Sequence, residues 1–186
     1  MKIAIVGATR GMGRALARRL AERGDALFLL GRDEVQMDLS ARDLEARGAP
    51  PGVGQARLDL GEPDGFVAAL DAADRGLSRM DALVVTGGLF ARPEELAADP
   101  ARLAALLHAN FTGTVLLCQQ AAERLAGRGG GLICVFGSVA GDRARRSNYL
   151  YGASKAGLDA FLSALRQRMF RRGVRVITVK PGFVDT

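Results

Sequence analysis

The chain has 186 residues, of which 48% are hydrophobic and 25% charged, and this composition is typical of a soluble globular protein with a hydrophobic core. The formal net charge of +6, from 26 basic and 20 acidic residues, raises the alternative of a nucleic-acid-binding protein. Since the chain has only two tyrosines and no tryptophan for base stacking, we expect no nucleic acid as a partner; a ligand that carries phosphate is the simpler use of a few arginines.

Short apolar runs alternate with helical patterns along the whole chain. We predict strands at 2–7, 26–31, 54–60, 82–87, 131–138 and 175–181, and helices near 11–23, 34–47, 62–74, 94–109 (continuing towards 126) and 150–172. This alternation predicts the α/β class: a doubly wound parallel sheet of the Rossmann type in a three-layer αβα arrangement. We find no repeat and no interdomain linker, so residues 1–186 are expected to form one domain.

Cysteine usage and hydropathy exclude several other classes. Cys118 and Cys134 lie in apolar segments without metal-ligand spacing, so we expect two buried free thiols, no metal site and a cytoplasmic protein. The N-terminus enters a strand directly and shows no signal-peptide pattern. We find no apolar run of about 18 residues and expect no membrane span.

A glycine-rich turn follows the first predicted strand, in "VGATRGMGRALARRL". Gly7, Gly11 and Gly13 give the spacing GxxxGxG and open the first predicted helix. Such a turn lets backbone N–H groups and a helix N-terminus meet a pyrophosphate, so it favours a dinucleotide ligand.

The second predicted strand ends in "LLGRD", where a dinucleotide-binding protein reads the adenosine ribose. An acidic residue is usual at this strand tip for a free 2′-hydroxyl, but Gly31 stands there and Arg32 follows. Arg32 and Arg10 would suit a 2′-phosphate, so NADP(H) is favoured over NAD(H). Two alternatives stay open: both residues are ordinary surface arginines, or Asp33 reaches the ribose and reverses the preference.

A tyrosine and a lysine are spaced for acid–base chemistry in "YLYGASKAG". The chain contains only three lysines among its 26 basic residues, so Lys155 is informative. Tyr151 and Lys155 are i and i+4 on a predicted helix, and a cation beside the phenol is expected to lower the pKa of Tyr151 towards neutrality. Tyr149 has no cation four residues later. Ser138, at the end of a predicted strand, could hold a carbonyl oxygen beside the phenol.

Over its whole length the chain resembles the short-chain dehydrogenase/reductase family. The matching segments are "GATRGMG", "LDL" with Asp59, "TGG", "HANFTGTV", Ser138, "YGASK" and "PGFVDT". The resemblance implies a ketone–alcohol oxidoreductase with one NAD(P)-binding Rossmann domain. The implied catalytic residues are Asn110, Ser138, Tyr151 and Lys155.

The same motifs imply a set of cofactor-binding residues. These are Gly7, Thr9, Arg10, Gly11, Met12, Gly13, Arg32, Asp59, Leu60, Gly87, Gly88, Tyr151, Lys155, Pro181, Gly182, Val184 and Thr186. By resemblance, Asp59 contacts adenine, Asn110 helps to form a proton relay through a water, and Thr186 holds the carboxamide.

Two departures from the family pattern affect the interpretation. The family's Asn-Asn-Ala-Gly is replaced by "VTGG" at 85–88, which puts its usual hydrogen bonds in doubt. Family members continue beyond the position of Thr186 into a lid, another helix and a seventh strand. Either the chain is a fragment or the sequence is the ordered portion of a longer protein; we expect the second, because lids are mobile without substrate.

The remaining expectations concern the substrate and assembly. Residues 137–166 look like the subgroup that contains the reductase of a 2-keto sugar on decaprenyl phosphate, in which Arg143, Arg145 or Arg146 would face a sugar phosphate; a solvated basic loop is the alternative. A small-molecule carbonyl or alcohol is the expected substrate, and a homodimer or homotetramer the expected assembly. The competing function is a catalytically silent dinucleotide sensor or scaffold.

Overall fold

The computed structural model describes residues 1–143 and 145–184 and contains one sheet of six parallel strands. The strand order is β3-β2-β1-β4-β5-β6, and each neighbouring pair is parallel. The strands are β1 (Lys2–Val6), β2 (Ala26–Gly31), β3 (Gly54–Arg57), β4 (Ala82–Val85), β5 (Gly131–Phe136) and β6 (Val174–Val179). The predicted doubly wound Rossmann-type fold is confirmed.

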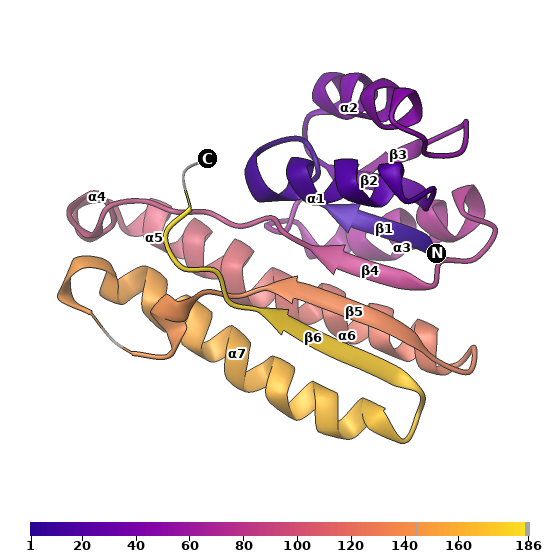
Figure 1. The fold of residues 1–186 in the computed structure, drawn as a ribbon. Coiled ribbons are helices and arrows are strands. Elements are labelled where there is room, and N and C mark those ends of the chain that lie inside the picture. The colour runs from indigo at the N-terminus through magenta and orange to yellow at the C-terminus, as the bar shows by residue number, and fades with distance from the viewer. Residues whose placement is uncertain (144, 185–186) are drawn as a thin grey trace.

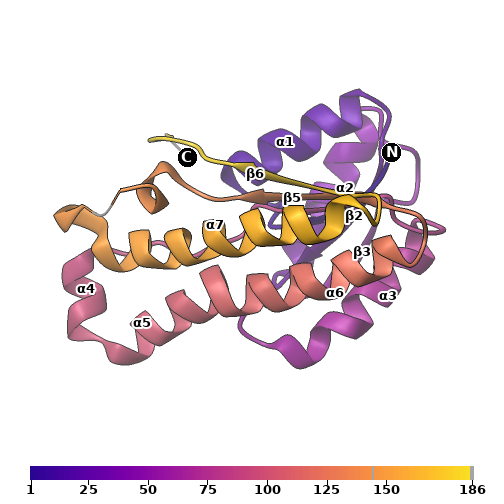
Figure 2. The ribbon, with the colours of Figure 1, turned by 90° about the horizontal axis from the view of Figure 1, so that it is seen from below.

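Helices lie on both faces of the sheet (Figures 1 and 2). One layer contains α1 (Gly11–Glu22) and α2 (Glu34–Ala46). The opposite layer contains α3 (Phe66–Gly76), α6 (Thr114–Ala126) and α7 (Tyr149–Phe170). The shorter elements are the 3-10 turns η1 (Pro63–Gly65), η3 (Val139–Gly141) and η4 (Arg146–Asn148), the helices α4 (Pro93–Ala98) and α5 (Pro100–Leu107), and the π-helical turn η2 (His108–Gly113).

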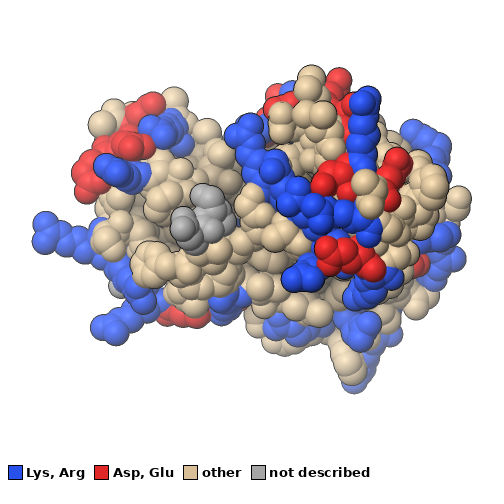
Figure 3. Space-filling view, turned by 45° about the horizontal axis from the view of Figure 1, so that its top comes forward, with Lys and Arg blue, Asp and Glu red and all other residues tan. Residues whose placement is uncertain are grey.

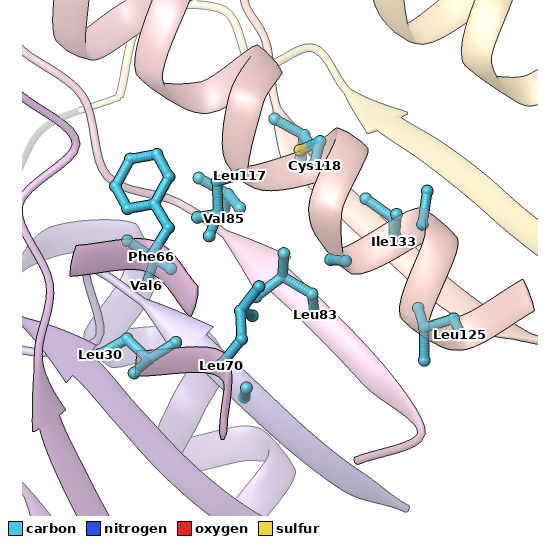
Figure 4. Close-up of a cluster of buried hydrophobic side chains, with 14 of the residues drawn as sticks. Val6, Leu30, Phe66, Leu70, Leu83, Val85, Leu117, Cys118, Leu125 and Ile133 are labelled. Atoms are coloured by element: carbon cyan, nitrogen blue, oxygen red, sulfur yellow. The ribbon is translucent and has the colours of Figure 1, made fainter. Parts of the chain in front are cut away.

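The larger hydrophobic core lies between the sheet and the α3–α6–α7 layer. Figure 4 shows Leu83 and Val85 of β4 among Phe66 and Leu70 of α3 and Leu117 of α6. All four residues of β4 are buried, as expected for a strand that is covered on both faces.

The opposite face of the sheet is covered unevenly. The core that α1 and α2 form with the sheet contains buried residues of β1, β2 and β4, while Leu132 and Cys134 of β5 are only partly buried and Ile177 of β6 is exposed. The prediction of two buried thiols is therefore wrong for Cys134, although Cys118 is fully buried. Burial raises the pKa of Cys118 to about 12 and also raises that of Cys134.

Several element boundaries differ from the predictions. β3 ends at Arg57 rather than at residue 60, because the chain turns around Asp59, whose Oδ1 accepts a hydrogen bond from the N–H of Gly61. The helix predicted at 62–74 begins as a 3-10 turn and ends at Gly76. The helix predicted from residue 94 is interrupted at Asp99, whose carboxylate accepts a hydrogen bond from the N–H of Arg102 and starts α5.

Within the described residues, one helical segment, Pro100–Ala126, bears on the expectation that the chain has no membrane span. Its 27 residues are long and apolar enough to cross a bilayer. Its α6 half, however, packs under the sheet, where Leu117, Cys118 and Ala121 are fully buried. The core helix of a globular domain passes the same test, so this segment is weak evidence for a membrane span.

Candidate active site

The glycine turn between β1 and α1 forms the floor of a cleft at the carboxyl ends of the strands. Gly7 and Gly11 have positive φ values of 86° and 49°, which glycine adopts without strain. A Cβ on Gly13 would lie 2.1 Å from the carbonyl oxygen of Gly7, so the turn can close only without a side chain there. Arg10 is the N-cap of α1 but makes no side-chain capping bond, so the first N–H groups of the helix are open to an anion.

Thr86 explains how the unusual "VTGG" segment holds this turn. Its hydroxyl donates to the carbonyl oxygen of Val6 at 2.9 Å and lies 3.1 Å from that of Gly7. The contact fastens the end of β4 to the end of β1 directly below the glycine turn. The "VTGG" segment therefore makes its own hydrogen bond to the glycine turn, in place of those expected from the family's Asn-Asn-Ala-Gly.

The cleft has a volume of about 1240 Å³ and is lined by eight of the residues predicted to bind a cofactor. These are Gly7, Thr9, Arg10, Arg32, Asp59, Leu60, Gly87 and Gly88. Sequence reasoning missed Ala104, Ala105 and His108, which also line it. Ala104 and His108 are i and i+4 in the helix predicted at 94–109, so the sequence alone could have indicated that they share one face of that helix.

Charged side chains gather at one end of the cleft. Blue and red side chains lie next to one another on this face of the molecule in Figure 3. The guanidinium of Arg32 is exposed and lies 3.8 Å from a carboxylate oxygen of Asp59. The carboxylate of Asp33 accepts a hydrogen bond from the N–H of Gln36 at 3.0 Å and caps α2, so one of its two oxygens is already engaged.

Asn110 lies at the other end, inside the π-helical turn η2, and is fully buried. Its Oδ1 accepts a hydrogen bond from the N–H of Leu89 at 2.6 Å, and its Nδ2 donates to the carbonyl oxygen of Leu89 at 2.8 Å. Nδ2 also lies 3.4 Å from Oγ of Ser154 on α7. The side chain thus connects the chain after β4 to the helix that carries Tyr151.

Ser138 follows β5 and faces the phenol of Tyr151. Its Oγ accepts a hydrogen bond from the N–H of Ala140 at 3.1 Å and starts the turn η3. Burial raises the pKa of Tyr151, and a hydrogen bond with the Ser138 side chain opposes this rise. The prediction of a lowered pKa for Tyr151 is wrong for this structure, because the loss of solvation outweighs the favourable contact.

Lys155 is buried, with 5% of its surface exposed. Nζ donates to the carbonyl oxygen of Phe136 at 3.0 Å and lies 5.8 Å from the ring centre of Tyr151. Burial lowers the pKa of Lys155 to about 8. A Cβ on Gly88 would lie 3.6 Å from this Nζ and 3.1 Å from Oδ1 of Asn110, so these two side chains lie directly behind a residue that lines the cleft.

The remaining predicted residues lie near this end or outside the described residues. The carbonyl oxygen of Pro181 accepts a hydrogen bond from the N–H of Val139 at 3.3 Å, which places the segment with Gly182 and Val184 beside Ser138. Met12 lies in the first turn of α1. Thr186 lies outside the described residues.

Comparison with known proteins gives a consistent result. The family model for short chain dehydrogenases matches residues 1–186. An uncharacterized oxidoreductase of Streptomyces coelicolor is 35% identical over 184 residues, which cover 97% of this chain and 71% of that protein. Sulfoacetaldehyde reductase 2 of Chromohalobacter salexigens is 34% identical over 186 residues, with 99% and 73% covered. A short-chain type dehydrogenase/reductase from Mycobacterium ulcerans has the same fold, with a TM-score of 0.89 and 23% identity over 99% of this chain and 68% of that one.

Proposed function

Because the chain belongs to the short-chain dehydrogenase/reductase family, we propose that it interconverts a ketone and a secondary alcohol, with NADP(H) as cofactor and Tyr151 as the acid/base. The observation that carries this proposal is that Ser138, Tyr151 and Lys155 lie together, with Nζ of Lys155 directly behind Gly88, which lines a cleft floored by a glycine turn. Residues 1–186 act as one dinucleotide-binding domain in this proposal.

The cleft suits a dinucleotide. Gly7, Gly11 and Gly13 leave room for a pyrophosphate at the open N-terminus of α1, and Asp59 and Leu60 border the region where adenine would lie. Bound NADP(H) supplies or accepts the hydride. Lys155, buried beside Gly88, would hold the ribose next to the nicotinamide.

The protein's own part of the chemistry is the movement of one proton. When a carbonyl carbon receives a hydride, its oxygen must gain a proton, and the phenol of Tyr151 gives it. Ser138 would hold the same oxygen by a hydrogen bond. Since burial raises the pKa of Tyr151, the phenol keeps its proton in this structure, and this is the form that reduction requires.

A preference for NADP(H) follows from the charged end of the cleft. Gly31 offers no carboxylate to a 2′-hydroxyl, and Asp33 is engaged as the cap of α2. Arg10 and Arg32 border the same space and would meet a 2′-phosphate. Asp59 lies near Arg32, so a bound phosphate would compete with it for the guanidinium.

The surroundings of Tyr151 favour a substrate with an apolar part and an anionic part. The ring of Phe90 stands edge-on against that of Tyr151, with 5.2 Å between ring centres, and Phe90 is 68% exposed. Arg143 and Arg145, in the loop after Ser138, are exposed and would attract a phosphate. We therefore place a sugar or a lipid-linked sugar phosphate among the substrates to be tested.

Assembly is proposed through the α5–α6 and α7 helices. Leu107, Phe111 and Leu116 are exposed on the outer side of the first segment. Phe111 also covers Gly157 of α7, where a Cβ would lie 3.2 Å from its ring. A two-fold axis along these helices would bury this apolar surface and give a homodimer or homotetramer. The proposed location of the assembly is the cytoplasm. Light scattering at micromolar concentration tests the assembly, and a monomer mass would contradict it.

The test of the function is NADPH oxidation with a panel of carbonyl compounds: 2,3-butanedione, an acetoacetyl thioester, sulfoacetaldehyde and a 2-keto-sugar phosphate. We expect turnover of at least one compound, with less or none when NADH replaces NADPH. Tight NADPH binding without turnover of any compound would favour the silent sensor or scaffold.

A further inference from the structure

Lys180, one of the three lysines, joins two separate parts of the chain. Its Nζ lies 2.6 Å from Oδ1 of Asp142 and 2.8 Å from Oδ2 of Asp159. Asp142 lies four residues after Ser138, and Asp159 lies one helical turn after Lys155 on α7. One ammonium group therefore connects the end of β6 to both elements that carry the acid–base candidates.

The backbone around Ser138 depends on the same end of β6. The N–H of Gly137 donates to the carbonyl oxygen of Val179 at 2.8 Å, and the N–H of Val139 donates to that of Pro181 at 3.3 Å. The first bond joins the residue after β5 to the last residue of β6; the second lies beyond both strands and is long. Lys180 lies between the two acceptors, so its side chain reinforces the contact where the strand ladder ends.

We propose that Lys180 is a positioning residue that clamps the Ser138 turn and helix α7 to the end of β6, and so fixes the hydroxyl of Ser138 relative to that of Tyr151. The proposal rests on the proposed function only in the consequence for catalysis. Both carboxylates raise the pKa of Lys180, so the ammonium stays charged throughout the neutral range. Lys180 itself would touch neither cofactor nor substrate.

The simpler alternative is a surface ion pair with no effect on the site, since most exposed pairs contribute little to stability. The chain contains a matched control, Asp43, which accepts from Arg18 at 2.8 Å and from Arg47 at 3.0 Å and joins α1 to α2. The side chains of Lys180 and Asp43 are 31% and 32% exposed. Each side chain joins two partners of opposite charge, but only the contacts of Lys180 adjoin Ser138.

The kinetic experiment compares Lys180→Met, Lys180→Arg and Asp43→Asn with the wild type, using NADPH and whichever carbonyl of the panel is turned over. We expect kcat to fall roughly tenfold in Lys180→Met, less than the ~100-fold loss that a 1 Å misplacement can cause. The NADPH Kd should stay unchanged in that variant, and kcat should stay within about twofold of the wild type in the other two. A wild-type kcat in Lys180→Met, or an equal loss in Asp43→Asn, would overturn the positioning role.

A second measurement needs no substrate and separates failure of the clamp from failure of the proposed function. Amide hydrogen exchange of Val139 and Ala140 should be about tenfold faster in Lys180→Met, with wild-type rates in Asp43→Asn and Lys180→Arg. Unchanged exchange at these two amides would refute the clamp. Faster exchange in an enzyme that reduces none of the carbonyls would leave the clamp supported and refute the proposed catalysis.

Discussion

The two ends of the cleft hold their functional groups by different means. At the candidate catalytic end, defined by Asn110, Ser138, Tyr151 and Lys155, the side chains are buried or half-buried, and Asn110 and Lys155 are fixed by backbone carbonyl oxygens at 2.8 and 3.0 Å. At the charged end, defined by Arg10, Arg32, Asp33 and Asp59, the guanidinium of Arg32 is exposed and has only a 3.8 Å contact with Asp59.

This difference predicts how each end responds to substitution. Water cannot take the place of a buried group that is held by the backbone. Substitution of such a group should therefore have a large effect on activity or stability, and salt should not change that effect. Solvent and counterions compete for the contacts of an exposed guanidinium. Its substitution should therefore have a moderate effect on ligand binding, and that effect should shrink at high ionic strength.

Tyr151→Phe should remove nearly all turnover and leave NADPH binding unchanged. The substitution deletes only the hydroxyl that we propose moves the proton, and general acid–base groups contribute about 10²–10⁴ in rate. Steady-state kinetics and a fluorescence titration with NADPH measure the two quantities. The matched control is Tyr149→Phe, which removes the chain's other phenol and should leave kcat near the wild-type value. A Tyr151→Phe enzyme with wild-type kcat would end the assignment.

Lys155 should make stability depend on pH in a definite direction. Its pKa in the folded protein is about 8, below the ordinary value of 10.5, so between these values the unfolded chain holds a proton that the folded protein has lost. The free energy of unfolding of the wild type should therefore rise relative to Lys155→Met by up to about 1.4 kcal/mol per pH unit above pH 8.

Urea unfolding of both proteins at about pH 7.5 and about pH 9.5 measures this difference. Comparison with Lys155→Met is necessary because the raised pKa of Cys118 acts in the opposite direction in the same range, and it cancels in the difference. A constant difference between the two proteins would show that Lys155 is solvated, contrary to the structure.

Arg32→Ala should weaken NADPH binding by about tenfold and leave NADH binding almost unchanged. One charge-assisted hydrogen bond to a 2′-phosphate contributes about 1.5–3 kcal/mol, and competition from Asp59 places the effect at the lower limit. The control is Arg42→Ala on α2, which removes an exposed guanidinium that is paired with Asp38. Equal Kd values for NADPH and NADH in the wild type would instead assign the choice of cofactor to Asp33 or the backbone.

Thr86→Val should lower the free energy of unfolding by about 1 kcal/mol. The hydroxyl contact with the end of β1 is lost, while the carbonyl oxygen of Val6 keeps the N–H of Thr86 as a donor at 3.0 Å. Urea unfolding measures the loss, and Thr112→Val, at an exposed position, should change stability by less than half as much. An unaffected Thr86→Val protein would mean that packing alone joins the two strands.

The sequence was informative where local rules decide the structure. The i, i+4 spacing predicted Tyr151 and Lys155 on one helix, and the apolar run before Ser138 predicted a strand that ends there; the structure has Tyr151 and Lys155 on α7 and Ser138 just after β5, because each position depends on one element and its direction. The same rules could not give the pKa of Tyr151, which depends on burial by distant segments such as Phe90.

Contacts between residues far apart in the sequence were also missed. Lys180 meets Asp142 across 38 residues, and Thr86 meets Val6 across 80, so only the folded chain reveals either contact. The scarcity of lysine was a usable signal for Lys180, but sequence reasoning applied it only to Lys155. The end of β3 was missed because a side-chain turn at Asp59 competes with an otherwise suitable strand pattern.

The π-helical turn His108–Gly113 also changes the phase of the long helix that contains it. A π turn has one residue more than an α turn, so residues after it are rotated by roughly 100° relative to an unbroken α-helix. Before the turn, Ala104 and Ala105 line the cleft; after it, Leu117 and Ala121 pack in the core beneath the sheet. Deletion of a single residue in the turn would restore the phase of an unbroken α-helix. The helix could then present its correct face either to the cleft or to the sheet, but not to both.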